Sequence, residues 1–276
     1  MSFRTYREVD GPDGSGIAEQ VEAQRAQVQE RLRSVRRIVA VMSGKGGVGK
    51  SYVTAALARA ASARWPARVG VLDADLRSPT VARLLDAAGP LVVTDGAVHP
   101  ALGACDTRVM STEFLLESGQ PLAWREPETE RFVWRGALET SVLREFLSDV
   151  RWGDLELLLV DLPPGADGVA DLSALVPELT GALAITIPTE DSRHSVSRAL
   201  RAAREAGIRL LGVIENMAGY RCADCGHTTA VFPGRAGAEL AAEFAIPLLA
   251  RIPFQPDGHA GSPVATEWER VLEAVP

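Results

Sequence analysis

A glycine-rich loop between an apolar strand and a helix constrains this chain more than any other feature. Residues 43–51 read SGKGGVGKS, and the apolar run at 38–42 before them has the composition of a buried strand. Positions 44–51 satisfy the pattern G-x-x-x-x-G-K-[ST] in the strand–loop–helix context that the pattern requires. Backbone N–H groups of such a loop converge on phosphate oxygens, and the helix N-terminus adds a partial positive charge. The chain is therefore expected to fold around a phosphate-binding loop.

The side chains of the loop predict how a nucleoside triphosphate would bind. Lys50 is expected to neutralise the β- and γ-phosphates, and the Ser51 hydroxyl to ligate Mg²⁺. Of the 29 Lys and Arg residues only Lys50 and Lys45 are lysine, and Lys45 occupies a position that the pattern leaves open. The residues expected to bind the nucleotide are Gly44, Lys45, Gly46, Gly47, Val48, Gly49, Lys50, Ser51, Tyr52 and Asn216.

From residue 38 onward, short apolar strands alternate with longer helical stretches. This alternation predicts one doubly wound α/β domain with a mostly parallel sheet, in which ligands bind at the carboxyl ends of the strands. The expected strands lie at 38–42, 68–72, 155–160, 182–187, 209–214 and 247–252. The expected helices lie near 49–64, 79–88, 137–150, 168–178, 191–206, 235–244 and 263–273. Residues 91–135 show little periodicity and are expected to be irregular.

Domain boundaries, composition and charge narrow the class of protein. Residues 1–16 are expected to be a flexible polar tail without the apolar stretch of a signal peptide, 17–36 an amphipathic helix, and 37–276 the nucleotide-binding domain. The formal net charge of −7 argues against general binding to nucleic acid, and no apolar run reaches the ~18 residues of a membrane helix. Three cysteines without an export signal favour a reducing, cytoplasmic location.

Two further strands end in acidic residues at the same edge of the sheet. Residues 71–75 read VLDAD, and the run at 155–160 is followed by Asp161 and then LPPG. Asp75 is expected to hold metal-bound water or to orient the attacking water, which would make it catalytic together with Lys50. Asp161 is expected beside Mg²⁺, as in a Walker B element. For Asp73, capping of the following turn is an equally good interpretation.

The only asparagine of the chain, Asn216, follows the strand expected at 209–214. Its amide offers a donor and an acceptor, which suit the N6/N7 edge of adenine. A helix cap or turn residue is the alternative interpretation. A guanine-specific N-K-x-D pattern would need a third lysine, so ATP is favoured over GTP.

Cys222 and Cys225 have the spacing that lets two thiols chelate one metal ion from a single turn. One such pair supplies only two soft ligands, so a closed four-thiolate site needs a second copy of the chain around a two-fold axis. A redox pair or half of a zinc ribbon would show the same spacing. The third cysteine, Cys105, is expected to be a small buried apolar side chain.

Taken together and in this order, SGKGGVGKS, VLDAD, VDLPPG, IENM and CADCG resemble the Mrp/ApbC family of iron–sulfur cluster carriers, within the MinD/ParA/nitrogenase iron protein superclass of deviant Walker A ATPases. The resemblance covers roughly residues 34–265. It implies a homodimer in which Lys45 reaches the partner's nucleotide and Cys222 and Cys225 of both chains hold a [4Fe–4S] cluster. It further implies that the cluster is transferred to apo iron–sulfur proteins and that ATP binding or hydrolysis alters the dimer.

Some positions depart from the family's pattern. Tyr52 stands where the family has threonine, and residues 163–168 read PPGADG in place of PPGTGD. Residues 121–135 carry an apparent insertion, in which Trp124-Arg125 and Trp134-Arg135 both resemble the family's single WRG. ATP hydrolysis is therefore expected to be slow.

Two alternatives to the carrier function stay open at this point. A ParA- or MinD-like partition ATPase would bind DNA or membrane, and a regulatory ATPase would hold Zn²⁺ on the same cysteines. DNA binding would depend on the arginine-rich stretch formed by Arg193, Arg198, Arg201 and Arg204, which is expected to be a solvated helix face.

Overall fold

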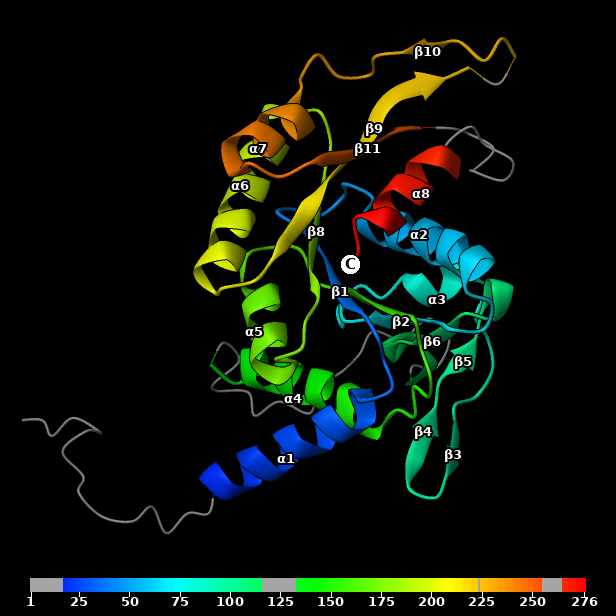
Figure 1. The fold of residues 1–276 in the computed structure, drawn as a ribbon, viewed down its shortest axis with the longest axis vertical. Coiled ribbons are helices and arrows are strands. Elements are labelled where there is room, and N and C mark those ends of the chain that lie inside the picture. Colours follow the sequence, from blue (N-terminus) through cyan, green and yellow to red (C-terminus); the bar gives the residue numbers. More distant parts are fainter. Residues whose placement is uncertain (1–16, 116–132, 223, 255–264) are drawn as a thin grey trace, which may run out of the picture.

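A nine-stranded, mostly parallel sheet forms the centre of the computed structural model, which describes residues 17–115, 133–222, 224–254 and 265–276 (Figure 1). The strand order is β10-β9-β8-β1-β7-β2-β6-β5, with β11 paired to β9 outside this path. The strands of this sheet are β1 (Ile38–Ser43), β2 (Val69–Asp73), β5 (Ala101–Leu102), β6 (Arg108–Met110), β7 (Leu157–Asp161), β8 (Gly181–Thr186), β9 (Leu210–Arg221), β10 (Thr228–Thr229) and β11 (Leu248–Phe254). Only the short strands β10 and β5 run antiparallel to their neighbours in the part of the sheet that is described.

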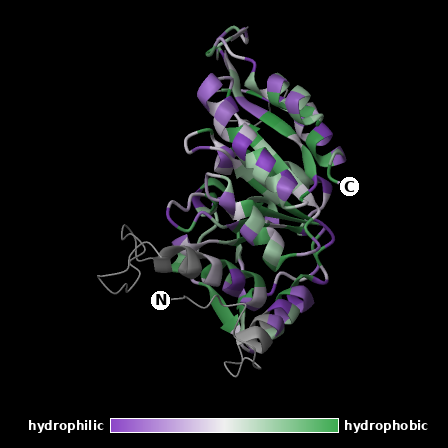
Figure 2. Ribbon diagram, turned by 90° about the vertical axis from the view of Figure 1, so that its left-hand side faces the viewer, coloured by the Kyte–Doolittle hydropathy of each residue, from purple (hydrophilic) through white to green (hydrophobic). Residues whose placement is uncertain are grey.

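Helices cover both faces of this sheet, and each face has its own hydrophobic core. The helices are α1 (Ile17–Leu32), α2 (Lys50–Arg64), α3 (Val81–Leu84), α4 (Val133–Asp149), α5 (Asp167–Leu175), α6 (Glu190–Glu205), α7 (Ala236–Phe244) and α8 (Ala265–Glu273). One core joins α1, α4, α5, α6 and α7 to the sheet, and the other joins α2, α3 and α8 to the opposite face. Figure 2 shows hydrophobic strands between helices with mixed, partly hydrophilic surfaces. The predicted doubly wound α/β class is confirmed.

The parallel register brings the functional loops to one edge of the sheet. β1 is buried along its whole length between β7 and β8, so its carboxyl end, where the phosphate loop starts, lies in the middle of that edge. Asp73 at the end of β2 is the register partner of Asp161 at the end of β7. Two acidic side chains that are far apart in the sequence therefore lie on adjacent strands beside the loop.

The expectation of an irregular segment at 91–135 is wrong for its described part. β6 pairs in parallel with β2 in the main sheet, and β3 (Val92–Thr94) pairs with β4 (Ala97–His99) in a separate hairpin. These strands are two or three residues long, which is too short for a period of two to stand out in the sequence. Trp124-Arg125 lies outside the described residues, and Trp134-Arg135 falls in the first turn of α4.

The N-terminal helix α1 packs against the nucleotide-binding domain through its last two turns. Val28 and Leu32 are buried in the core that α4 also enters, and Arg31 Nε donates a hydrogen bond to the carbonyl of Ser148 at 2.9 Å. The predicted tail at 1–16 lies outside the described residues. In the described part of the chain, no helix has both the length and the apolar character that crossing a bilayer would require.

β9 is twice as long as the expected strand at 209–214, and this extension carries the cysteine loop. The strand runs beyond β8, stays paired with β11 as far as Tyr220 and turns back through β10, which Figure 1 shows at the opposite end of the molecule from α1. Met217 has a left-handed backbone (φ +52°), and the pairing of β11 with β9 shifts register just after the partner of Asn216. Such irregularities bend and twist a strand, and here they redirect β9 away from the main sheet.

Candidate functional site: a phosphate loop and a cysteine loop joined by one strand

The phosphate loop spans residues 44–49 between β1 and α2, and its shape depends on glycine. Gly47 and Gly49 have φ of +80°, a conformation in which a side chain would be strained. A Cβ on Gly44 would lie 2.1 Å from the backbone carbon of Ser195, so the start of the loop is pressed against α6. The loop is thus held by close backbone packing on α6 and leaves its N–H groups at the N-terminus of α2.

A cavity of about 680 Å³ opens over this loop and brings most of the predicted nucleotide-binding residues together. Lys45, Lys50, Ser51 and Tyr52 line it together with the predicted catalytic Asp75. The remaining lining residues are Ser43, Gly46, Gly47, Val48, Gly49, Ser78, Thr80, Arg83, Leu84 and Pro164. Burial raises the pKa of the Tyr52 hydroxyl, so this side chain presents a neutral ring and O–H to the cavity at pH 7.

Asp161 lies fully buried at the base of the loop and accepts three short hydrogen bonds. Its Oδ2 lies 2.6 Å from Lys50 Nζ and 2.6 Å from Ser51 Oγ. Its Oδ1 accepts a hydrogen bond from Thr54 Oγ1, also at 2.6 Å. The predicted lysine, hydroxyl and Walker B carboxylate are thus in direct contact. Thr54 carries no sequence signal of its own, because the loop pattern ends at Ser51.

The other two acidic residues at this edge differ in their surroundings. Asp75 is half-buried and faces the cavity. Asp73 is fully buried and accepts hydrogen bonds from the backbone N–H groups of Thr80 and Val81 at 2.9 and 3.1 Å, as a capping residue does. Burial, and next the charge of Asp161, raise the pKa of Asp73 to about 7. Of the two interpretations of Asp73, the structure supports the cap.

Asn216 contacts the phosphate loop directly. Its side chain is 4% exposed, and Nδ2 donates a hydrogen bond to the carbonyl of Val48 at 2.9 Å. The same nitrogen lies 2.3 Å from the point where a Cβ on Gly49 would stand, so only glycine fits there. The geometry gives Asn216 a role that the sequence did not suggest, a link between β9 and the loop; contact with adenine stays a prediction.

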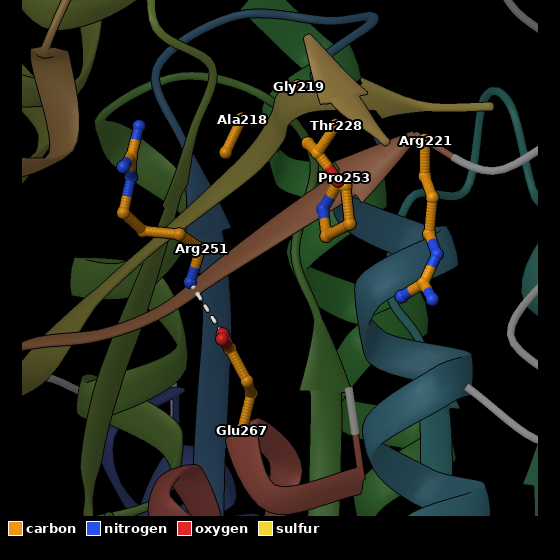
Figure 3. Close-up of a pocket in the computed structure, with 7 residues that line it drawn as sticks. All are labelled: Ala218, Gly219, Arg221, Thr228, Arg251, Pro253 and Glu267. Atoms are coloured by element: carbon orange, nitrogen blue, oxygen red, sulfur yellow. Dashed lines mark hydrogen bonds between the residues drawn. The ribbon is translucent and has the colours of Figure 1, made fainter. Parts of the chain in front are cut away.

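The residue before Asn216 belongs to a second polar cluster that the sequence did not indicate. Glu215 is 1% exposed, and it accepts hydrogen bonds from the backbone N–H of Gly237 at the start of α7 and from Arg251 Nε on β11, both at 2.8 Å. Arg251 also borders a cavity of about 280 Å³ beneath the cysteine hairpin, where Glu267 accepts from its backbone N–H (Figure 3). This cluster fixes β9 against β11 and α7 next to the phosphate loop.

The cysteine loop begins directly at the end of β9. Cys222 is half-exposed and Cys225 exposed, and neither forms a disulfide. The backbone of the loop closes on itself, because Gly226 N–H donates to the carbonyl of Cys222 and Cys222 N–H donates to that of His227. Hydrogen bonds from the backbone N–H groups of Cys225 and Asp224 lower the pKa of the Cys222 thiol. A lowered pKa favours the thiolate, which is the form of cysteine that binds metal ions.

The described residues of one chain contain no group of three or more His, Cys, Asp or Glu side chains able to hold a metal ion together. The cysteine loop therefore offers two thiols and no third ligand within that part of the chain. The third cysteine is also placed differently from expectation. Cys105 is exposed and lies in a turn with φ of +58°, so the expectation of a buried apolar side chain is wrong.

The arginine-rich face of α6 is solvated as expected, because Arg198, Arg201 and Arg204 are exposed, but it also contacts neighbouring acidic residues. Arg193 forms ion pairs with Glu190, Glu239 and Glu243, and Arg201 pairs with Glu243 at 2.7 Å. Arg204 donates to the carbonyl of Phe244 and lies over its ring. Three of the four arginines therefore bind α7 and its acidic residues, which removes most of the positive charge that a DNA-binding face would need.

The fold, together with the phosphate loop and its contacts to Asp161, identifies this chain as a P-loop nucleotide-binding protein. The chain belongs to the family described as ParA: NUBPL iron-transfer P-loop NTPase, whose model matches residues 34–268. It is 35% identical to the "Iron-sulfur cluster carrier protein" of Saccharolobus solfataricus, over 94% of this chain and 89% of that protein. It is 37% identical to the "Cytosolic Fe-S cluster assembly factor NUBP2" of Homo sapiens, over 89% and 95% respectively.

Solved structures agree with this family. A nucleotide-binding protein from Archaeoglobus fulgidus, solved in complex with ADP, superposes with a TM-score of 0.70 at 32% identity and covers 91% of this chain and 97% of that chain. The cell division ATPase MinD of Pyrococcus furiosus matches with a TM-score of 0.54 at 21% identity, over 87% of this chain and 98% of that chain. The second match shows the shared fold alone.

The raised pKa of Asp73 predicts how stability changes with pH. The folded protein holds the proton up to about pH 7, whereas the unfolded chain releases it near the ordinary value of 3.8. The free energy of unfolding contributed by this group is therefore highest below about pH 4 and falls as the pH rises to 7. Asp73→Asn keeps an acceptor for Thr80 and Val81 but cannot titrate, so urea denaturation should show a flatter pH profile for this variant than for the unmodified protein.

A matched control for this measurement is Asp86→Asn, because the Asp86 side chain is 77% exposed, in contrast to the buried Asp73. Its profile should run parallel to that of the unmodified protein. Parallel profiles for Asp73→Asn as well would show that Asp73 does not titrate between pH 4 and 7.

Proposed function

We propose that this protein is an ATP-binding carrier that assembles an iron–sulfur cluster and transfers it to apoproteins. The observation that carries the proposal is that β9 belongs to both sites. Asn216 on this strand holds the phosphate loop through Val48, and six residues further on the same strand delivers Cys222. The family and the relatives named as iron–sulfur cluster carriers and assembly factors support this function.

The nucleotide site would act through groups that already converge on Asp161. Ser51, Asp75 and Asp161 offer hydroxyl and carboxylate oxygens, which are the ligands that Mg²⁺ prefers. Mg²⁺ bound there would neutralise charge on the phosphates. Lys50 would exchange Asp161 for the β- and γ-phosphate oxygens when ATP binds, so nucleotide binding breaks a buried ion pair at the base of the loop.

We infer slow turnover from the surroundings of the phosphates. Tyr52 occupies a position in the cavity where the family has threonine, and its ring replaces a compact hydroxyl. The loop after Asp161 departs from the family's sequence at residues 163–168, and Pro164 of this loop lines the cavity. Groups that position the attacking water determine much of the rate of phosphoryl transfer, so these changes favour slow hydrolysis.

The cargo site would be completed by a second copy of the chain. Each chain brings Cys222 and Cys225, and a two-fold axis between two such loops supplies the four thiolates that a [4Fe–4S] cluster takes. The cysteine loop lies at one end of the molecule, so the cysteine loops of two chains could approach each other without a clash between the rest of the two chains (Figure 1). The lowered pKa of Cys222 favours the thiolate that binds iron.

The alternatives are less well supported. A DNA-binding partition ATPase would need the arginines of α6, three of which contact α7 and its acidic residues. Zinc would suit four thiolates equally well, but the names of the relatives refer to iron–sulfur clusters. We place the protein in the cytosol, as the name of the human relative says of that protein.

Substitution of the two loop cysteines tests whether they bind an iron–sulfur cluster. Protein reconstituted anaerobically with iron and sulfide should be brown, and Cys222→Ser combined with Cys225→Ser should lose the visible absorbance and the bound iron. Cys105→Ser is the matched control, because Cys105 is exposed but distant in sequence from the loop, and this variant should keep both signals. Unchanged iron in the double variant would remove the hypothesis, and zinc in place of iron would favour the regulatory alternative.

Lys45 tests whether the nucleotide site is shared between two copies. If this lysine reaches the partner's phosphates, Lys45→Ala should weaken ATP-dependent dimerisation and hydrolysis at least tenfold and change the Kd for ATP much less. Lys45→Arg keeps the charge and serves as the comparison, although its planar head need not reproduce the contact. An equal loss of nucleotide binding, dimerisation and hydrolysis would place Lys45 in the pocket of its own chain.

A further inference from the structure

A buried hydroxyl on α2 contacts Asp161 from the side opposite to the phosphate loop. Thr54 is fully buried and lies three residues after Ser51, on the same face of the helix. Its Oγ1 lies 2.6 Å from Asp161 Oδ1 and 3.0 Å from the carbonyl oxygen of Lys50. A hydroxyl has one proton, and a carboxylate at 2.6 Å is the stronger acceptor of the two. Thr54 therefore donates across the gap between α2 and β7.

This contact makes the two oxygens of Asp161 inequivalent. Oδ2 accepts from Lys50 and Ser51, the two side chains that would meet phosphate and Mg²⁺. Oδ1 accepts from Thr54, which does not line the cavity and lies outside the loop pattern that ends at Ser51. With Asp161 0% exposed, rotation of the carboxylate about its χ2 bond would break a short hydrogen bond on each side.

We propose that Thr54 is a positioning residue for nucleotide-dependent metal binding. By holding Oδ1, it keeps Oδ2 turned toward Ser51 and the phosphate loop, where the Mg²⁺ of a Mg²⁺–nucleotide complex would lie. Groups that hold a ligating carboxylate in place change metal affinity or activity by about 10- to 100-fold when they are removed. The inference rests on the proposed role of Asp161 toward Mg²⁺, and it assigns a function to a residue outside the motif.

The test compares ADP binding with and without Mg²⁺ by isothermal titration calorimetry. ADP is used because it is not hydrolysed, so the readout is independent of turnover. In Thr54→Val, a substitution of equal shape that lacks the hydroxyl, we expect the gain in ADP affinity that Mg²⁺ gives to fall by about tenfold or more. The Kd for ADP in EDTA should change by less than about threefold, because the loop backbone and Lys50 are intact. Thr54→Ser should restore the Mg²⁺ effect.

A matched control is available on the same helix. Ser62 is buried on α2, and its hydroxyl bonds to that of Thr107 at 3.0 Å, away from Asp161. Ser62→Ala removes a buried hydroxyl of the same helix and should leave the Mg²⁺ effect unchanged. If Thr54→Val does not fold, as judged by a thermal melt, Thr54→Ala is measured in the same way with the same expectation.

Any one of four results would overturn the inference. An unchanged Mg²⁺ effect in the Thr54 variant would show that Asp161 needs no help from this hydroxyl. Equal weakening of ADP with and without Mg²⁺, or failure of Thr54→Ser to restore the effect, would mean that Thr54 acts on the fold of the loop as a whole. If Mg²⁺ does not strengthen ADP binding to the unmodified protein, the proposed role of Asp161 toward Mg²⁺ fails together with that of Thr54. The other results contradict only the role of Thr54.

Discussion

The buried carboxylate of Asp161 organises the nucleotide site. It ends a strand at the centre of the sheet and receives Lys50, Ser51 and Thr54, all from the first turns of α2, at 2.6 Å each. A fully buried charge is costly unless it is paired and hydrogen-bonded, and these three donors meet that requirement. The same contacts dock the N-terminus of α2 on β7 and so fix the phosphate loop between β1 and that helix. In the proposed nucleotide complex, Lys50 would leave this ion pair for the phosphates.

β9 connects the phosphate loop to the cysteine loop at one end of the molecule. Asn216 holds the carbonyl of Val48, Glu215 ties the strand to α7 and β11, and the left-handed backbone at Met217 lies between these anchors and Cys222. A change in the loop can therefore act on the cysteines through one continuous strand. We propose that nucleotide binding changes the affinity of the cysteines for the cluster through this strand.

Much of this arrangement could be predicted from the sequence, for identifiable reasons. The glycine pattern around Lys50 requires a strand before it and a helix after it, and apolar runs that are buried on both faces stand out in the sequence, so the doubly wound fold followed. The strand β6 and the β3–β4 hairpin were missed because they are too short to show a period.

Contacts made across the fold were not predictable in the same way. Thr54 and Glu215 look like ordinary helix and strand residues until α2 meets β7 and β9 meets α7. The exposure of Cys105 and the pairing of the α6 arginines with α7 likewise depend on tertiary neighbours that no local pattern encodes. The sequence motifs thus identified the functional side chains, whereas the residues that position them became evident only from tertiary contacts.

We propose that each cluster site is built by two copies of this chain, which the mass and iron content of the anaerobically reconstituted protein in solution would test. The expected particle has twice the 29.4 kDa chain mass and about two iron atoms per chain, because two chains supply the four thiolates of one [4Fe–4S] cluster. Iron retained at the same ratio by a particle of one chain mass would contradict this proposal.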